Sequence, residues 1–236
     1  MNTVYDKTGN DASRMRRAIA ISAITVAGLW YIKLCEFLFG FDLTGFGVYP
    51  GKLHGLSGIL FAPLIHSSWL HLAANSGPML ILMTALLYGY PKSSKVVLPV
   101  VYFATGILVW LFARPVYHIG ASGVTFGMLF FITVIGFIRW DKRALALSLI
   151  VFFLYGGMMG GLFPEEKNIS YETHIAAACL GIVLAIVLRN LDPPPPKKVY
   201  SWELEDEEEI DEWDGWEYEE DTVSKYETPD DERTLH

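Results

Sequence analysis

The sequence predicts an all-α polytopic membrane protein, a bundle of six transmembrane helices with the N- and C-termini in the cytoplasm. Composition is the first ground: 52% of the 236 residues are hydrophobic and the mean hydropathy is +0.33, which is too apolar for a soluble domain of this size. Run length is the second, because the apolar residues gather in stretches close to the ~20 residues that cross a bilayer. The third is the placement of the basic residues, which follows the positive-inside rule.

Six apolar runs follow one another along the chain. They span residues 18–41, 69–90, 96–113, 123–138, 144–163 and 174–188. Three arginines precede the first run, as in a secretory signal peptide, but the run is too long for one and lacks a clear small-x-small cleavage site. We therefore expect it to remain as the first helix. The sixth run is the shortest and lies closest to the lower limit for a span.

Basic residues assign a side to each connection. Most of them lie before the first run, between the second and third, between the fourth and fifth, and after the sixth (Arg14, Arg16, Arg17, Lys92, Lys95, Arg139, Lys142, Arg143, Arg189, Lys197 and Lys198). The opposite side holds only Lys33, Lys52, Arg114 and Lys167. In a chain of six spans the four basic places face one way, and the positive-inside rule makes that side the cytoplasm.

Three parts follow from these boundaries: a cytoplasmic N-terminal segment at 1–17, whose polar start is expected to be flexible, a six-helix membrane domain at 18–190, and a cytoplasmic tail at 191–236. The tail opens with four prolines, which form a stiff extended spacer. An acidic run with three tryptophans follows, and most of the acid behind the net charge of −8 lies there. We expect a disordered, solvated tail; the alternative is an acidic-aromatic motif that docks a basic partner.

The long outer connection and the two cysteines carry further expectations. Residues 42–68 hold five glycines and an apolar patch at 59–65; the segment is too apolar for a solvated loop, so it should lie in the interface or pack on the bundle. Cys35 and Cys179 fall in apolar runs and are expected to be buried packing residues rather than a disulfide. No ligand spacing indicates a metal or another cofactor, and nothing indicates nucleic acid.

A few polar side chains stand inside or beside the apolar runs, where ionisable groups are costly and mark functional sites. They are His66, His71, Asn75, Ser122 and His174. His71 and Asn75 are four residues apart and share one face of the second helix. The second, fourth and sixth helices all run inward from the outer side, so all of these groups come to that side. One bundle can gather them in a single cavity open to outer water.

Ser122 has the chemical partners that a nucleophile needs. A serine hydroxyl is a poor nucleophile until a base takes its proton, and a histidine, here His174, is the usual base. The oxyanion needs donors, which His71, Asn75 and the backbone N–H of Ser122 at a helix N-terminus can supply. A triad acid is missing, because Glu172 lies two residues before His174 and faces elsewhere on a helix. A Ser-His dyad therefore fits better than a triad.

Helix packing offers an alternative explanation for each residue. Serine and glycine are ordinary in membrane helices, and His71 with Asn75 can form an interhelical hydrogen-bonded pair. His174 can be an interfacial histidine at a helix end. His66 is expected to be structural in either case, holding the outer connection. Packing alone does not explain why all of them gather at one side of the bilayer, so catalysis is favoured.

Small residues also predict close packing of the fourth and sixth helices. Gly123 and Gly127 lie one turn apart on the fourth helix. The sixth helix carries a small-residue face that follows its histidine (His174, Ala177, Ala178 and Gly181). Such faces let membrane helices approach closely, and the approach brings Ser122 and His174 within hydrogen-bond reach.

Together these residues resemble the motifs of the rhomboid family of intramembrane serine proteases. Three motifs occur in the family's order: H-x-x-x-x-H-x-x-x-N at His66, His71 and Asn75; G-x-S-G at Gly120, Ser122 and Gly123; and a histidine followed by small residues at His174 and Gly181. The resemblance covers about residues 42–189 and includes the order of the six helices.

The resemblance implies a six-helix rhomboid-like bundle with a water-filled cavity open to the outside. It makes Ser122 the nucleophile and His174 the general base, with His71, Asn75 and the backbone N–H of Ser122 as the oxyanion hole. Substrates of the family are typically single-pass membrane proteins, cut in or near the bilayer at small residues. The implied partners are therefore transmembrane protein substrates and the lipid bilayer.

The chain departs from the family pattern in three places. Phe126 stands where members often have a tyrosine that stacks on the base, and a phenyl ring can still stack. Ala177 replaces a frequent glycine, and its methyl group is expected to widen the contact between the fourth and sixth helices. A Trp-Arg pair that many members carry in the first outer loop is absent, which concerns the anchoring of that loop.

Glycines at the outer end of the fifth run suggest a gate. They are Gly156, Gly157, Gly160 and Gly161, and each weakens a solvated helix by ~1 kcal/mol relative to alanine. Our hypothesis is that this end bends away to admit a substrate helix laterally, with residues 164–173 as a lid. The alternative is glycine-mediated packing.

Three classes of function compete. The favoured one is an intramembrane serine endopeptidase in a bacterial plasma membrane, with its active site open to the extracytoplasmic side. A non-catalytic rhomboid-like protein that binds membrane clients for quality control has the same fold, but such proteins usually lack the serine or the histidine. A transporter with a polar relay needs ionisable groups through the depth of the membrane, and here they cluster at the outer face.

Overall fold

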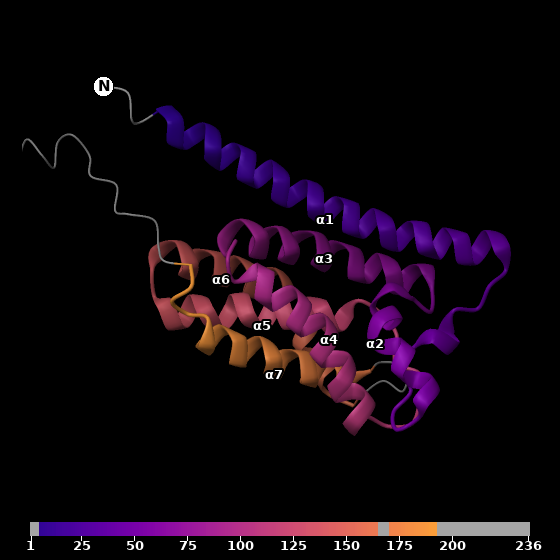
Figure 1. The fold of residues 1–236 in the computed structure, drawn as a ribbon. Helices are drawn as coiled ribbons and strands as arrows, with labels where there is room; N and C mark the ends of the chain where they lie inside the picture. Colours follow the sequence, from indigo (N-terminus) through magenta and orange to yellow (C-terminus); the bar gives the residue numbers. More distant parts are fainter. Residues whose placement is uncertain (1–4, 165–169, 193–236) are drawn as a thin grey trace, which may run out of the picture. The chain divides into compact units, whose positions relative to one another are not determined.

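The computed structural model describes residues 5–164 and 170–192, and in this part of the chain every named element is helical (Figure 1). The elements are α1 (Tyr5–Phe39), η1 (Thr44–Phe46), η2 (Leu53–Ser57), α2 (Gly58–Phe61), η3 (Ala62–Leu64), α3 (Trp69–Gly89), α4 (Ser94–Phe112), α5 (Ser122–Arg139), α6 (Lys142–Tyr155), η4 (Gly156–Leu162) and α7 (Tyr171–Val187). The η segments are 3-10 helices.

Five helical stretches are long and apolar enough to cross a membrane: 11–39, 69–89, 94–112, 122–139 and 142–162. The sixth predicted run forms α7, a shorter apolar helix of 17 residues. The predicted all-α polytopic fold is therefore confirmed, with five spans of full length and α7 packed among them.

α1 lies along α3, as Figure 1 shows. Side-chain hydrogen bonds join the pair along its length: Trp30 Nε1 donates to Ser76 Oγ over 2.9 Å, Thr84 Oγ1 donates to Ser22 Oγ over 3.0 Å, and the Tyr88 hydroxyl donates to Asp11 over 3.0 Å. The helix begins at Tyr5, so the N-terminal stretch expected to be flexible is helical from that residue on. No proline interrupts residues 5–13, which continue without a break into the apolar part of α1, although the glycine, asparagine and aspartates there have low intrinsic helix propensity.

α5 occupies the middle of the bundle. It packs against α3, α4, α6 and α7, and 67% of its span is buried, compared with 28% or less for the other long helices. The largest cluster of buried apolar side chains centres on it (Met128, Leu129, Phe131, Ile132 and Ile135). Since α5 meets four other helices, most of it is buried, whereas Ser122 at its N-terminus is half-buried.

Glycines bring the backbones of α5 and α7 together, although not with the pairing that the sequence predicts. A Cβ on Gly181 would lie 2.4 Å from the carbonyl oxygen of Gly127, so α7 rests on the α5 backbone there. The missing side chain of Gly127 itself faces Val101 of α4, at 2.3 Å. Gly123 faces Thr173 of α7, and Ala177 is fully buried between the helices. The glycines of α5 therefore serve two different neighbours.

The outer connection packs on the bundle. Val48 pairs with His118 in an isolated antiparallel bridge, and Trp110 Nε1 at the end of α4 donates to the carbonyl of Lys52 over 2.9 Å. Gly55 and Gly58 permit the fold of this segment, because a Cβ on either would lie 2.1 Å from backbone atoms of residues 48 and 49. This glycine-rich connection thus forms a close-packed cap over the outer end of α4.

Both cysteines are free thiols. Cys35 is half-buried, whereas Cys179 is exposed on α7, so the prediction that Cys179 is buried is wrong. α7 has one face on α5 and the other outward, and apolar residues on the outward face of a membrane helix need no protein contact. The predicted proline spacer and acidic motif of the tail, and residues 165–169 of the predicted lid, lie outside the described residues.

Candidate active site

The backbone that leads into Ser122 is fixed on both sides. Gly120 has φ +114°, a conformation that L side chains rarely adopt, and a Cβ there would lie 2.8 Å from Cε1 of His71. The N–H of Gly120 donates to the carbonyl of Ala62 over 2.8 Å, and the N–H of Ala121 donates to Nε2 of His66 over 3.3 Å. Ser122, which is half-buried, then opens α5.

His174 bridges Ser122 and the 3-10 segment η4. Its Nε2 lies 2.8 Å from Oγ of Ser122, and its Nδ1 lies 2.8 Å from the carbonyl oxygen of Gly161. A carbonyl can only accept, so Nδ1 carries a proton, and in the neutral ring Nε2 then presents a lone pair to the serine hydroxyl. This is the tautomer in which a histidine can take the serine proton, and here a peptide carbonyl holds it in place of a triad acid.

Phe126 fixes the plane of the imidazole. It lies one turn after Ser122 on α5, and its ring stacks on His174 with the centroids 4.0 Å apart and the planes 4° apart. His174 is buried, at the fourth position of α7. The ring is therefore constrained by one face contact and two hydrogen bonds. Ala177 does not separate the helices enough to break the contact between Ser122 and His174.

A polar network ties the start of α7 to the segment before α5. Arg114 Nε lies 3.2 Å from Glu172 Oε1, and its guanidinium stands over the ring of Tyr171. His118 Nδ1 lies 2.5 Å from Ser170 Oγ. Glu172 thus pairs with Arg114, while the His174 ring bonds to Gly161 and Ser122 instead, as the helical spacing requires. These contacts hold the two chain segments that carry Ser122 and His174.

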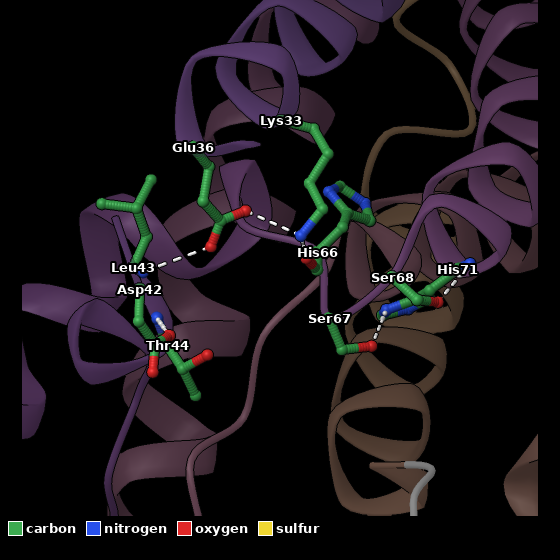
Figure 2. A network of polar contacts seen from close by, with 9 residues as sticks. All are labelled: Lys33, Glu36, Asp42, Leu43, Thr44, His66, Ser67, Ser68 and His71. Carbon is green, nitrogen blue, oxygen red and sulfur yellow. Dashed lines mark hydrogen bonds and ion pairs between the residues drawn. The ribbon is translucent and has the colours of Figure 1, made fainter. Parts of the chain in front are cut away.

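His71 and Asn75 come from the outer end of α3. Ser68 caps this helix by accepting the N–H of His71, and Ser67 Oγ lies 3.1 Å from Nδ1 of His71 (Figure 2). The His71 ring faces Gly120. Asn75 is buried and donates one amide N–H to the carbonyl of His71 over 2.9 Å. The structure places His71 beside the serine segment, and its role and that of Asn75 in an oxyanion hole stay predictions.

His66 is buried between α1, α3 and the serine segment. Burial, together with the nearby His71, lowers the pKa of His66 to about 4, so the ring is neutral at pH 7. A neutral ring is needed here, because Nε2 accepts the N–H of Ala121. Its backbone carbonyl accepts from Lys33 Nζ over 2.8 Å. His66 thus contacts both α1 and the serine segment, and the structural role expected from the sequence stays a prediction.

A small cavity of about 30 Å³ lies beside the serine segment. It is lined by the outer connection, by α4, by residues 118–120 and 123–124, and by Thr173 of α7. One of its lining side chains, Thr105, has a buried hydroxyl that bonds to none of the described residues. The space fits one or two water molecules. Ser122 and His174 are not among the lining residues, so this cavity is a neighbour of the site.

Sequence reasoning missed three contributors: the carbonyl of Gly161, the Arg114–Glu172 pair and Lys33. A backbone carbonyl leaves no mark in a sequence, and Gly161 is conspicuous only as a glycine. Arg114 and Lys33 are visible as basic residues on the side where the positive-inside rule expects few. That exception is the signal that could have identified them.

These features define a class: a polytopic integral membrane protein in which a serine hydroxyl and a histidine ring are in hydrogen-bond contact at the N-terminal end of a largely buried helix. The Rhomboid domain model matches residues 53–191. Uncharacterized proteins of Mycobacterium bovis and Mycobacterium tuberculosis are each 35% identical over 175 residues, which is 69% of this chain and 72% of theirs. An uncharacterized protein of Mycobacterium leprae is 33% identical over 175 residues, 69% of this chain and 68% of its own.

The chain belongs to the rhomboid family, as the resemblance of its motifs indicates. This is a family of intramembrane serine proteases that also has non-catalytic members. Membership therefore gives the fold and the membrane location, and the activity of this chain depends on its own residues.

Proposed function

We propose that this protein is an intramembrane serine endopeptidase that cleaves transmembrane segments of membrane proteins with Ser122 and His174. The observation that supports it is the pair of 2.8 Å contacts on either side of the His174 ring. One contact joins the base to the nucleophile, and the other sets the tautomer that a base requires.

The chemistry proceeds in two halves. The Ser122 oxygen attacks the scissile carbonyl while its proton moves to Nε2 of His174, and the resulting oxyanion is bound by the Ser122 N–H with His71 and Asn75. Collapse breaks the C–N bond, and the imidazolium gives its proton to the leaving amine. Water then attacks the acyl-enzyme and gives a proton to His174; collapse breaks the bond between the acyl carbon and Ser122 Oγ, and the imidazolium returns the proton to Oγ. The products are a free acid and the restored serine.

Among the described residues, the His174 ring bonds to a carbonyl and a hydroxyl and to no carboxylate, which fits this mechanism. The imidazolium that forms keeps its Nδ1–H on the Gly161 carbonyl, and a carbonyl dipole stabilises a cation more weakly than a carboxylate does. Ring orientation is supplied by Phe126 instead of by a charge. A neutral orienting partner also avoids an unpaired carboxylate at membrane depth, which is costly.

A non-catalytic client-binding protein is the second candidate. It needs the same bundle but no bond between a serine and a histidine, and that bond is what favours the protease here. For the location, the mycobacterial relatives favour a bacterial plasma membrane. The positive-inside rule favours an active site open to the extracytoplasmic side. Transmembrane substrates and the lipid bilayer are the proposed partners, with a basic partner of the acidic tail as a further one.

Labelling and cleavage test the proposal. Purified protein is treated with a fluorophosphonate probe and, separately, with a model single-pass membrane substrate. We expect the wild type to label and to cleave, Ser122→Ala to do neither, and His174→Ala to lose at least a hundredfold in cleavage rate. A folded wild type that neither labels nor cleaves, beside an active control protease, would refute the enzymatic function.

A further inference from the structure

The outer end of α1 contains an ion pair that the catalytic residues do not explain. Lys33 Nζ lies 2.7 Å from Glu36 Oε2, and the two side chains are only 14% and 11% exposed. Both residues belong to α1, which is otherwise long and apolar enough to be a membrane-spanning helix. Buried charges in such helices are costly unless paired, and their presence points to a function.

The two side chains use their remaining bonding capacity on the outer connection. Lys33 Nζ also donates to the backbone carbonyl of His66 over 2.8 Å. The other oxygen of Glu36 accepts the N–H of Leu43 over 3.2 Å. Figure 2 shows the pair between these partners. The ion pair therefore ties α1 to the start of the outer connection and to its end.

The end held by Lys33 leads directly to the site. Nε2 of His66 accepts the N–H of Ala121, the residue before Ser122. The His66 ring lies 5.1 Å, between centroids, from that of His71. The two residues after His66 both bind His71. Ser67 Oγ contacts the His71 ring, and Ser68 Oγ accepts the backbone N–H of His71. One anchored peptide group thus positions both the serine backbone and a predicted oxyanion donor.

We propose that Lys33 and Glu36 are positioning residues of the catalytic centre, which act through His66 on the Ser122 backbone and on His71. This inference rests on the proposed protease function. Donors to an oxyanion must be held close to their productive geometry, and a displacement of about 1 Å can lower a rate about a hundredfold. The ion pair supplies this precision from α1, which lies outside the Rhomboid domain match at 53–191.

Simple attachment of α1 to the bundle is the competing explanation, and the chain offers a control for it. Trp30 lies one turn from Lys33 on the same helix, and its hydrogen bond goes to Ser76 of α3, whereas that of Lys33 goes to the carbonyl of His66. Trp30→Phe removes a hydrogen bond of the same helix pair. Lys33→Met removes the ion pair and the bond to His66.

The experiment compares full-length variants in detergent and in liposomes. For each, kcat and KM on the model substrate, the fluorophosphonate labelling rate and the thermal midpoint are measured. We expect Lys33→Met to lower kcat about tenfold or more with little change in KM. Trp30→Phe should keep kcat within about twofold of wild type. Lys33→Arg, which can still pair with Glu36 and donate to the carbonyl, should recover most of the loss.

A second readout does not depend on activity. Hydrogen exchange of the peptide that contains Ala121 should be faster in Lys33→Met than in Trp30→Phe. If Lys33→Met does not fold because Glu36 is left unpaired, the double variant Lys33→Met/Glu36→Met removes both charges and takes its place. The proposal is overturned if Lys33→Met, or the double variant in its place, keeps wild-type kcat and wild-type exchange. It is also overturned if Trp30→Phe loses as much kcat as Lys33→Met does. An inactive wild type contradicts the protease function instead, and the exchange measurement still decides the positioning role.

Discussion

Single residues around His174 divide the work that a triad acid does elsewhere. The backbone carbonyl of Gly161 accepts a hydrogen bond from Nδ1, and the Phe126 ring stacks on the imidazole and fixes its plane. The sequence points to Ser122, His174 and Phe126, because side-chain chemistry and helical spacing are visible in it. It does not point to the acceptor, because any residue type provides a carbonyl and only the tertiary fold aims it.

Gly161 should not tolerate a side chain, whereas its neighbour Gly160 should. A Cβ on Gly161 would lie 3.0 Å from Nδ1 of His174 and 3.3 Å from Cζ of Phe126, whereas Gly160 has nothing within 4 Å. We therefore expect Gly161→Ala to displace the ring and slow fluorophosphonate labelling about tenfold. Gly160→Ala should label like the wild type. Equal labelling by both variants would show that the carbonyl contact does not govern the base.

At the scale of elements, apolar runs predict the helices well, whereas their ends follow other forces. The fifth run was expected to be one helix, but α6 stops at Tyr155 and the chain continues as the 3-10 segment η4. Four glycines give this stretch low helix propensity, and its last turn is set by the bond to His174. α1 is longer than predicted, since the limit of an apolar run is not a helix stop signal.

The gate hypothesis can now be tested without touching the base. Gly157 and Gly160 both have open space where a Cβ would stand, so a double alanine variant stiffens η4 without a clash. If η4 moves to admit a substrate helix, Gly157→Ala/Gly160→Ala should cleave the transmembrane substrate several-fold more slowly. Labelling by the small probe should not change. Unchanged cleavage would favour the packing role for these glycines.

For the whole molecule, the sequence best predicts at which side of the bundle the polar groups lie. Topology alone gathers His71, Ser122 and His174 at one side, and the fold brings Ser122 and His174 into contact. The sequence predicts poorly which side chains of distant segments contact one another. Nothing in the spacing of Lys33 and His66, more than thirty positions apart, indicates that they meet, because loop folding and not helical periodicity decides it.

Stability should depend on pH through His66. The ring titrates near ~6.5 in an unfolded chain, and burial lowers its pKa to about 4 in the folded protein. Stability is therefore full above about pH 6.5 and falls toward pH 4, because the unfolded state binds a proton that the folded state does not. The two pKa values correspond to a loss of about 3 kcal/mol in unfolding free energy.

His66→Gln provides the comparison for this pH effect. Glutamine can accept the N–H of Ala121 but does not titrate. Thermal midpoints in detergent, measured at pH 7 and at pH 4.5, should therefore fall further in the wild type than in the variant. An equal fall in both would assign the acid sensitivity to other groups.

The bond between His174 and Gly161 has a consequence for timing. The same short segment holds the base and, under the gate hypothesis, yields to the incoming helix. A substrate that keeps η4 displaced would then occupy the site while the imidazole lacks its orienting partner, and would leave uncut. Only a substrate segment that allows η4 to return to its position would remain bound long enough to meet an aligned His174. Selection would then act on dwell time as well as on the residues at the cut.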